Sequence, residues 1–314
     1  MAANMEVKPI LPPFATKQSD IRLFSPEFNK TALRNNMNLR TILLIGASLQ
    51  AIIGLLPIPR IYVALPAILM LTAKIIDTAL VTFNYKANPY LKNMMPKKTT
   101  AQPLDRNGDF SGAGKQKIAV LILGVKSNHP LGFFAPDFDK VGGYLKKMSD
   151  LLENDQTQES GFLGQSCLNK TDKNGANEFI FISYWRGLED VHRFAHGELH
   201  REAWRWWEST LKQHNYIGFM HEVYEAPASS YEGVYINFQP SLLGATTYLK
   251  KDGKMVGGEV KPEWISPLVD ANKGPMRTSN NRRGLKDRKD IVDEMFGERN
   301  AYEAVGTIGG SKAA

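Results

Sequence analysis

The sequence predicts an α+β protein, in which a ferredoxin-like domain of order β-α-β-β-α-β follows an N-terminal transmembrane helical hairpin. Three observations carry this prediction. Two long apolar stretches occur before residue 85, strand-like and helix-like patterns alternate between residues 116 and 250, and a histidine- and tryptophan-rich helix precedes the last strand of that region.

The composition is that of one folded domain with attached segments. Of the 314 residues, 43% are hydrophobic and 23% are charged, so the core of one globular domain can be filled. The formal net charge of +7 indicates an acidic partner, such as a phospholipid surface or nucleic acid, and does not choose between them. A single cysteine, Cys167, excludes an intramolecular disulfide framework and a cysteine-rich zinc site.

Residues 1–38 form a polar N-terminal segment, and a membrane hairpin is expected at residues 39–85. The run "TILLIGASLQAIIGLLPIP" at 41–59 is uncharged over nearly the length that crosses a bilayer. A second apolar stretch at 61–83 contains Lys74 and Asp77, which are three apart and could pair on one helix face. The alternatives are a buried soluble hairpin and, for the second stretch, a helix at the membrane interface.

The flanking charges predict the orientation of this hairpin. Arg60 is the basic residue between the two apolar stretches. More basic residues lie before the first stretch and after the second: Lys30, Arg34, Arg40, Lys86, Lys92, Lys97 and Lys98. The positive-inside rule then places both ends of the hairpin, and the domain that follows it, in the cytosol. We expect the membrane to be that of the endoplasmic reticulum.

Residues 86–115, rich in Pro, Gly, Asn and Lys, are interpreted as a linker to the catalytic domain at 116–250. In this domain apolar runs predict strands, and apolar residues spaced by three and four predict helices. The expected strands lie at 117–125, 161–169, 178–185 and 216–227, and the helices at 137–154 and 187–213. Residues 231–240 are a candidate fifth strand.

The strand at 117–125 is apolar on both sides, whereas two helices cover only one face of the expected sheet. We therefore expect a homodimer that covers the other face. Residues 251–314 are predicted to be a basic, largely disordered tail. This tail lacks the interleaved aromatic residues that stack on bases, so no nucleic-acid partner is expected, and anionic lipid is favoured.

The expected helix 187–213 places His192, His196 and His200 four residues apart. In the zinc-protease signature a Glu directly follows the first His, but here Gly197 stands in that place and Glu198 is rotated away. No third ligand has a matching spacing, so we expect no metal. An ideal helix places Trp206 on the stripe that packs on the sheet and Trp207 beside the histidine row.

A histidine at the edge of the helix–sheet seam can act as an acid or base in a pocket. His196, His200, His221 and Glu222 are the catalytic candidates, because one of the two successive strand residues must face the helices. The residues expected to bind the substrate are mostly aromatic, which suits an apolar small molecule: Phe179, Phe181, Trp185, His192, Trp207 and Phe219. The alternative is that the histidine row is a packing edge.

The run "FISYWRGLEDVHRFAHGELHREAWRWW", followed by "HEVYEAP" and "YINFQP", resembles a fungal monooxygenase-like family of unassigned function in the dimeric α/β-barrel superfamily. The resemblance covers roughly residues 115–250. It implies a pocket between sheet and helices, and a place among cofactor-free monooxygenases or among haem enzymes such as aldoxime dehydratases. In the haem-degrading branch an Ala-His pair on this helix binds the iron, whereas this sequence has Ala203-Trp204 there. His196 and His200 are the alternative ligands on the same helix.

The sequence therefore predicts a membrane-anchored, monooxygenase-like tailoring enzyme that acts on a hydrophobic secondary metabolite, such as a polyketide or terpenoid. Histidine-assisted acid/base chemistry in an aromatic pocket would carry the reaction, with no cofactor. Three alternatives stay open: a haem-dependent dehydratase or oxygenase of the same fold, a cofactor-free cyclase or isomerase, and a non-catalytic membrane adaptor.

Overall fold

The structure, a computed structural model, describes residues 7–18, 23, 25–252, 255–256, 259–260 and 262–285. The chain divides into two compact units. The larger consists of residues 1–28 and 95–314, and the smaller of residues 29–94.

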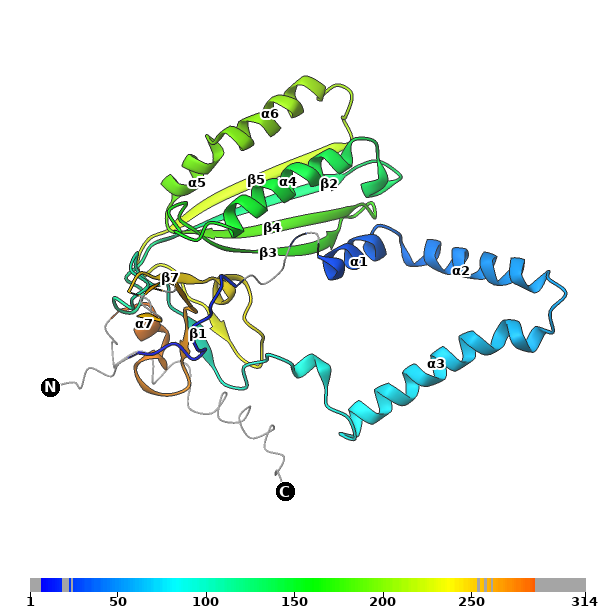
Figure 1. Ribbon diagram of the computed structural model, residues 1–314, viewed down its shortest axis with the longest axis horizontal. Coiled ribbons are helices and arrows are strands. Elements are labelled where there is room, and N and C mark those ends of the chain that lie inside the picture. Colours follow the sequence, from blue (N-terminus) through cyan, green and yellow to red (C-terminus); the bar gives the residue numbers. More distant parts are fainter. Residues whose placement is uncertain are drawn as a thin grey trace. The chain divides into compact units, whose positions relative to one another are not determined.

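The main sheet of the larger unit has four antiparallel strands in the order β3-β4-β2-β5. These strands are β2 (Ile118–Ser127), β3 (Phe162–Thr171), β4 (Asn177–Trp185) and β5 (Ile217–Ala226). Helix α4 (Phe138–Glu153) joins β2 to β3, and α5 (Leu188–Ala195) and α6 (Glu198–Thr210) join β4 to β5. All three helices lie on one face of the sheet (Figure 1). The ferredoxin-like order predicted from the sequence is thus confirmed for this domain.

The expected continuous helix at 187–213 is wrong, because the chain breaks at His196 and Gly197. The amides of these two residues still donate to the carbonyls of His192 and Phe194, which closes α5, and α6 begins at Glu198. A Cβ atom at position 197 would lie only 3.0 Å from the Phe194 carbonyl oxygen, so glycine suits this tight turn. The break changes the rotation of every later side chain relative to an ideal helix.

The helix side of the sheet contains a buried core at one end. Trp185 is 1% exposed and packs against Phe162 and Phe194 with ring centroids 5.2 and 5.5 Å apart. Its indole Nε1 donates a hydrogen bond to the Ser183 hydroxyl at 2.9 Å. The same core includes Ala119, which pairs with Trp185 across the strands. This end of the helix layer is therefore closed by packing.

The opposite face of the sheet is covered at one end by the chain itself. The short helix η3 (Leu242–Ala245) contacts β3 and β4, and the Thr247 amide donates to the Leu163 carbonyl. Further along this face Leu168, Met220 and Tyr224 are 41–56% exposed. η3 thus covers one end of this face, and a homodimer through the remaining apolar patch stays a prediction.

Small antiparallel sheets complete the larger unit. One has the order β11-β1-β6, a second pairs β7 with β10, and a third pairs β8 with β9. The strands are β1 (Thr99–Ala101), β6 (Val234–Tyr235), β7 (Tyr248–Lys250), β8 (Met255–Val256), β9 (Glu259–Val260), β10 (Glu263–Ile265) and β11 (Leu268–Asp270). The remaining helices of this unit are η2 (Gly132–Phe134), η4 (Gly274–Met276) and α7 (Ser279–Arg282). The expected fifth strand at 231–240 is only β6, which pairs with β1 instead of the main sheet.

Two expected irregular segments are partly folded. Within the expected linker 86–115, Ala101 and Leu104 are buried in a core cluster with Leu268. Within the expected disordered tail 251–314, Trp264 is 0% exposed, and its strand is joined by a backbone bridge to Phe14 of the polar N-terminal segment. The prediction of disorder is therefore wrong for residues 262–285, and residues 286–314 lie outside the described residues.

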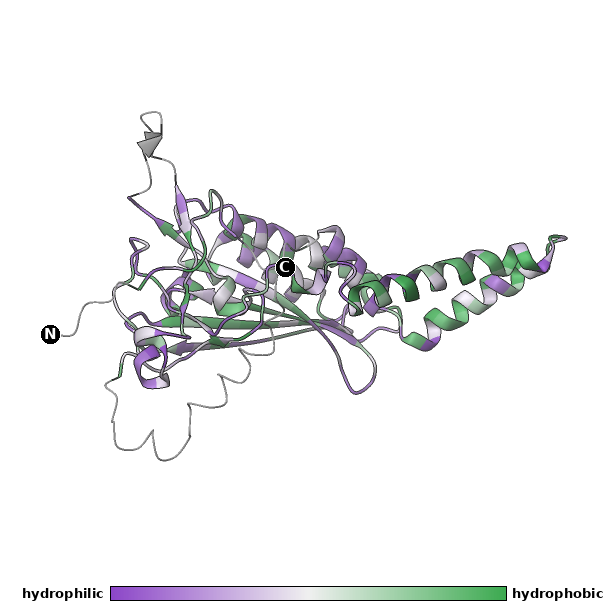
Figure 2. Ribbon diagram, turned by 90° about the horizontal axis from the view of Figure 1, so that it is seen from below, coloured by the Kyte–Doolittle hydropathy of each residue, from purple (hydrophilic) through white to green (hydrophobic). Residues whose placement is uncertain are grey.

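The smaller unit consists mainly of two apolar helices, α2 (Leu39–Gly54) and α3 (Arg60–Thr82). Helix α1 (Pro26–Asn35) precedes them and η1 (Pro89–Leu91) follows. Most residues of α2 and α3 are themselves hydrophobic, as the green parts of their ribbons in Figure 2 show. Asp77 pairs with Lys86, not with Lys74 as the spacing suggested.

Of the helices in the described part of the chain, α3 alone is by itself long and apolar enough to cross a membrane. Helix α2 reaches that length only together with α1, from which it is bent by 91°.

Candidate functional site

A cavity of about 150 Å³ lies between the main sheet and helices α4 and α6; we call it the inner cavity. Its floor comes from β2 and β5, and its walls come from apolar and aromatic side chains of the two helices. The lining residues are Leu123, Val141, Tyr144, Leu145, Met148, His200, Ala203, Trp204, Trp206, Trp207, Phe219 and His221. Four of the residues predicted from the sequence are among them: His200, Trp207, Phe219 and His221.

The register of the sheet explains which strand residues reach the inner cavity. Leu123 pairs with His221 across β2 and β5, and side chains alternate along each strand. His221 therefore faces the helices, and Glu222 points to the opposite face of the sheet, where it accepts a hydrogen bond from the Tyr224 hydroxyl at 2.6 Å. Glu222 was a catalytic candidate, but the sheet separates it from the inner cavity.

The two neighbouring tryptophans of α6 do not divide as predicted, since both line the inner cavity. Trp207 contacts the sheet, because its ring meets Phe219 edge-on at 4.9 Å. Trp206 instead lies 5.8 Å from Tyr144 of α4 and 5.9 Å from His214. The prediction that Trp206 packs on the sheet is therefore wrong, and the reason is the altered helix rotation after Gly197.

His200 is half-buried at the rim of the inner cavity, 6.0 Å from the Phe194 ring. Burial lowers its pKa below the ordinary value of 6.5, and the nearby His221 and His196 lower it further. A hydrogen bond to the Ala195 backbone raises the pKa but does not cancel these effects. Ala195 ends α5, so its carbonyl is one of those that lack a partner within the helix. A neutral His200 that donates to this carbonyl keeps its other ring nitrogen free to accept a proton.

A second hollow, of about 620 Å³, adjoins the inner cavity on the outer side of α6; we call it the outer hollow. His200 and Trp204 line both spaces. His196 lines only the outer hollow and is exposed at the break between α5 and α6. The structure thus separates His196 from the inner cavity, and His200 is the histidine at the boundary.

The other predicted substrate-binding residues line neither space. His192 is exposed on α5, and Trp185 belongs to the packed core described above. Phe179 stacks on Phe133 at 4.5 Å and on Phe28 at 5.3 Å, and Phe181 is buried beside it. Trp185, Phe179 and Phe181 all face the helix layer, as predicted. Their rings pack against other side chains of the protein and line neither space.

Sequence reasoning missed the wall that α4 contributes. Val141, Leu145 and Met148 recur at spacings of three and four, which predicts the helix but does not separate core positions from cavity positions. Tyr144 lies between them, and its hydroxyl donates to Glu202 of α6 at 3.2 Å. This hydrogen bond joins the two helical walls of the inner cavity.

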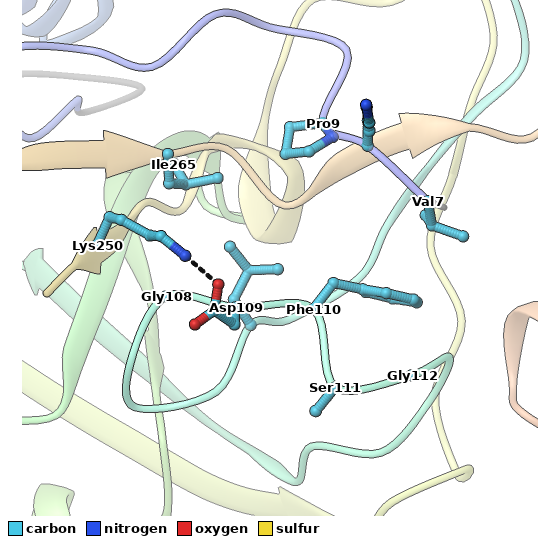
Figure 3. A pocket seen from close by; sticks show the side chains of 11 residues that line it. Val7, Pro9, Gly108, Asp109, Phe110, Ser111, Gly112, Lys250 and Ile265 are labelled. Atoms are coloured by element: carbon cyan, nitrogen blue, oxygen red, sulfur yellow. Dashed lines mark hydrogen bonds and ion pairs between the residues drawn. The ribbon is translucent and has the colours of Figure 1, made fainter. Parts of the chain in front are cut away.

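A third hollow, of about 680 Å³, lies elsewhere in the larger unit (Figure 3). It is lined by Val7 to Pro9, residues of the loop 108–112, Lys250 and Ile265, among others. Lys250 forms an ion pair with Asp109, so these two charges neutralise each other. None of the predicted site residues lines this hollow, and its size alone does not make it a reaction site.

The volume of the inner cavity equals that of about five water molecules, whereas drug-sized ligands need roughly 300–1,000 Å³. Position 204, where the resemblance implied an iron-binding histidine, is occupied by Trp204, and an indole N–H has no lone pair for a metal. His200 and His221 are the histidines that line this cavity. No cluster of three or more metal-binding side chains occurs among the described residues.

Comparison with known proteins confirms the resemblance predicted from the sequence. Residues 118–243, from β2 to η3, match the model of the family described as monooxygenase af470-like. The chain is also 29% identical over 286 residues to the protein named Monooxygenase af470 from Aspergillus fumigatus, and this match covers 90% of the chain and 100% of that protein.

Some solved structures are similar to this chain at lower sequence identity. An aldoxime dehydratase in complex with butyraldoxime is 15% identical, with a TM-score of 0.33, over 60% of this chain. The chain spans 44% of the length of that dehydratase. SnoaB, a cofactor-independent oxygenase from Streptomyces nogalater, is 15% identical, with a TM-score of 0.23, over 34% of this chain and 90% of its own.

The lowered pKa of His200 gives a testable prediction. A base must be unprotonated to act, so His200 should be competent at neutral pH and lose its function as the pH falls through its pKa. We expect the imidazole of His200, followed by NMR of histidine-labelled protein and assigned with His200→Gln, to titrate with a midpoint below 6.5. His221→Gln should raise this midpoint, because His221 contributes to lowering the pKa. A midpoint at or above 6.5 in the wild-type protein would contradict this assignment.

Proposed function

Because residues 118–243 match the monooxygenase af470-like family, we propose that the protein is a monooxygenase-like tailoring enzyme acting on a hydrophobic secondary metabolite. The single observation that supports this most strongly is His200, a half-buried histidine with a lowered pKa at the rim of an aromatic cavity. This arrangement can take a proton from an apolar substrate, whose reacting carbon lies in the inner cavity.

The reaction begins with proton transfer. His200 takes the proton from an acidic C–H or O–H group of the substrate, and the imidazolium that forms keeps its hydrogen bond to the Ala195 carbonyl. The resulting electron-rich anion then reacts with dioxygen: one oxygen atom enters the product as a carbonyl group, and the other leaves as water. His221 and Trp207 lie in the same lining and hold the substrate against His200.

The aromatic lining supports this chemistry by excluding water. Trp204, Trp207 and Phe219 present apolar surface on both sides of His200, and a dry site strengthens the charge interactions of the developing anion. His196 and Glu222, the other two catalytic candidates, do not line the inner cavity and have no role in this step. An isomerase or cyclase would use the same proton transfer without dioxygen.

Replacing His200 tests the proposed function directly. A host strain that lacks the gene should accumulate the substrate, which carries one oxygen atom fewer than the product, and this metabolite can be purified. Full-length His200→Gln should convert it at a rate about 100-fold lower than wild type, while its circular dichroism is unchanged. The matched control His192→Gln removes an exposed histidine that lines neither space, and it should keep wild-type turnover.

Two outcomes would overturn parts of this proposal. Full turnover by His200→Gln would leave the histidine as a packing residue and favour a different role for the domain. An accumulated metabolite with the same elemental composition as the product would indicate an isomerase or cyclase instead of an oxygenase.

We also propose that residues 39–85 anchor the enzyme in the endoplasmic reticulum membrane with the catalytic domain in the cytosol. The exposed apolar surfaces of α2 and α3 and the basic flanks of both helices support this. We expect the full-length protein to stay in the membrane pellet after a carbonate wash and to enter solution with detergent. Release by carbonate alone would contradict the anchor.

A further inference from the structure

The inner cavity is too small to hold a whole metabolite of ordinary size. It offers about 150 Å³, and pockets for drug-sized ligands enclose roughly 300–1,000 Å³. The outer hollow of about 620 Å³ supplies the missing space, since His200 and Trp204 line both. A substrate with its reacting carbon near His200 therefore extends past Trp204 into the outer hollow.

The outer hollow differs from the inner cavity in its charge. Arg201 and Arg205 are four residues apart on α6, and side chains at this spacing lie next to each other on a helix surface. Glu198 is the one acidic residue of the lining. The apolar inner cavity thus shares His200 and Trp204 with a space that is lined by two arginines and one glutamate.

The guanidinium groups of these two arginines have no hydrogen bond or ion pair with other described residues. Other arginines of the larger unit are paired: Arg193 binds Asp190 at 2.6 Å, and Arg282 binds Glu232 at 2.5 Å. A guanidinium group forms forked, charge-assisted hydrogen bonds with phosphate and carboxylate groups. Arg201 and Arg205 are therefore free to bind an anion that enters the outer hollow.

The start of α6 also lies at the outer hollow, where the carboxylate of Glu198 opposes part of its partial positive charge. Helix α6 begins at Glu198, which lines the outer hollow, and Gly197 provides no side-chain cap for its first amides. The N-terminal end of a helix carries a partial positive charge that favours anions.

From these observations we propose that the outer hollow binds a phosphate or carboxylate group of the substrate, while the apolar part of the same molecule occupies the inner cavity. The substrate class is thus an amphipathic anion, not a neutral hydrocarbon. This inference rests on the proposed function, because it concerns the substrate of the same site. Arg201 and Arg205 are positioning residues here, since they hold the far end of the substrate.

Binding measurements with three simple ligands test this. Full-length protein in phosphatidylcholine nanodiscs is titrated by calorimetry with octyl phosphate, 1-octanol or inorganic phosphate, and empty nanodiscs serve as the blank. Octyl phosphate has both chemical parts, 1-octanol has only the chain, and inorganic phosphate has only the charge. We expect octyl phosphate to bind at least about 10-fold more tightly than either of the others, because one charge-assisted hydrogen bond corresponds to about that factor.

Variants separate the arginines from general electrostatics. Arg201→Gln with Arg205→Gln should weaken octyl phosphate binding by about 10-fold or more and leave 1-octanol binding unchanged. The control Lys173→Gln with Lys212→Gln removes the same number of charges at exposed positions outside both spaces, and it should bind octyl phosphate like the wild type.

The outcomes distinguish this inference from the proposed function. Equal affinity for octyl phosphate and 1-octanol, or no effect of the arginine variant, would overturn the anionic substrate and leave the apolar cavity in place. Equal affinity for octyl phosphate and inorganic phosphate would show an anion site without a chain site. Failure of both chain-bearing ligands to bind would overturn this inference and count against the proposed function as well.

Discussion

The site depends on the break between α5 and α6. In a continuous helix the Ala195 carbonyl would accept the amide hydrogen of Leu199, four residues later. Because the chain turns at His196 and Gly197, this carbonyl is left to interact with the His200 side chain instead. That interaction raises the pKa of His200 and opposes the larger lowering effect of burial. The same turn places the start of α6 at the outer hollow.

The packing around the break explains why the base is near the surface yet partly dry. The end of the helix layer near Trp185 is closed by aromatic packing, whereas the end near Phe219 leaves the inner cavity open between α4 and α6. His200 lies at the rim of this cavity, where burial lowers its pKa without removing its access to solvent. A fully buried histidine could not exchange its proton, and a fully exposed one would have its ordinary pKa.

Local periodicity predicted the main sheet and its helices, because each element has its own pattern. The apolar run of β2 and the spacing of α4 are visible within a few residues of sequence. Alternation in β5 showed that His221 and Glu222 face opposite sides, but the register with Leu123 was needed to decide which faces the helices. Elements with a clear period were therefore predictable, and the pairing between them was not.

The sequence failed where structure depends on a single residue or on distant pairing. One glycine inside a helical pattern costs only about 1 kcal/mol relative to alanine, so Gly197 alone does not predict a break. The prediction that Trp206, and not Trp207, packs on the sheet was wrong for this reason. The region 262–285 contains few apolar residues, but Trp264 is buried through its bridge to Phe14, about 250 positions earlier. No local pattern encodes such a contact.

The central claim is that the substrate reacts inside the inner cavity. The most direct measurement fills that cavity without changing any histidine. Ala203 is a half-buried lining residue on α6, and its replacement by Phe places a ring in the space that the substrate would occupy. If the reaction takes place there, full-length Ala203→Phe will fail to convert the metabolite that accumulates in the deletion strain, while its melting temperature stays close to that of the wild type. Wild-type turnover by a correctly folded Ala203→Phe variant would contradict the claim.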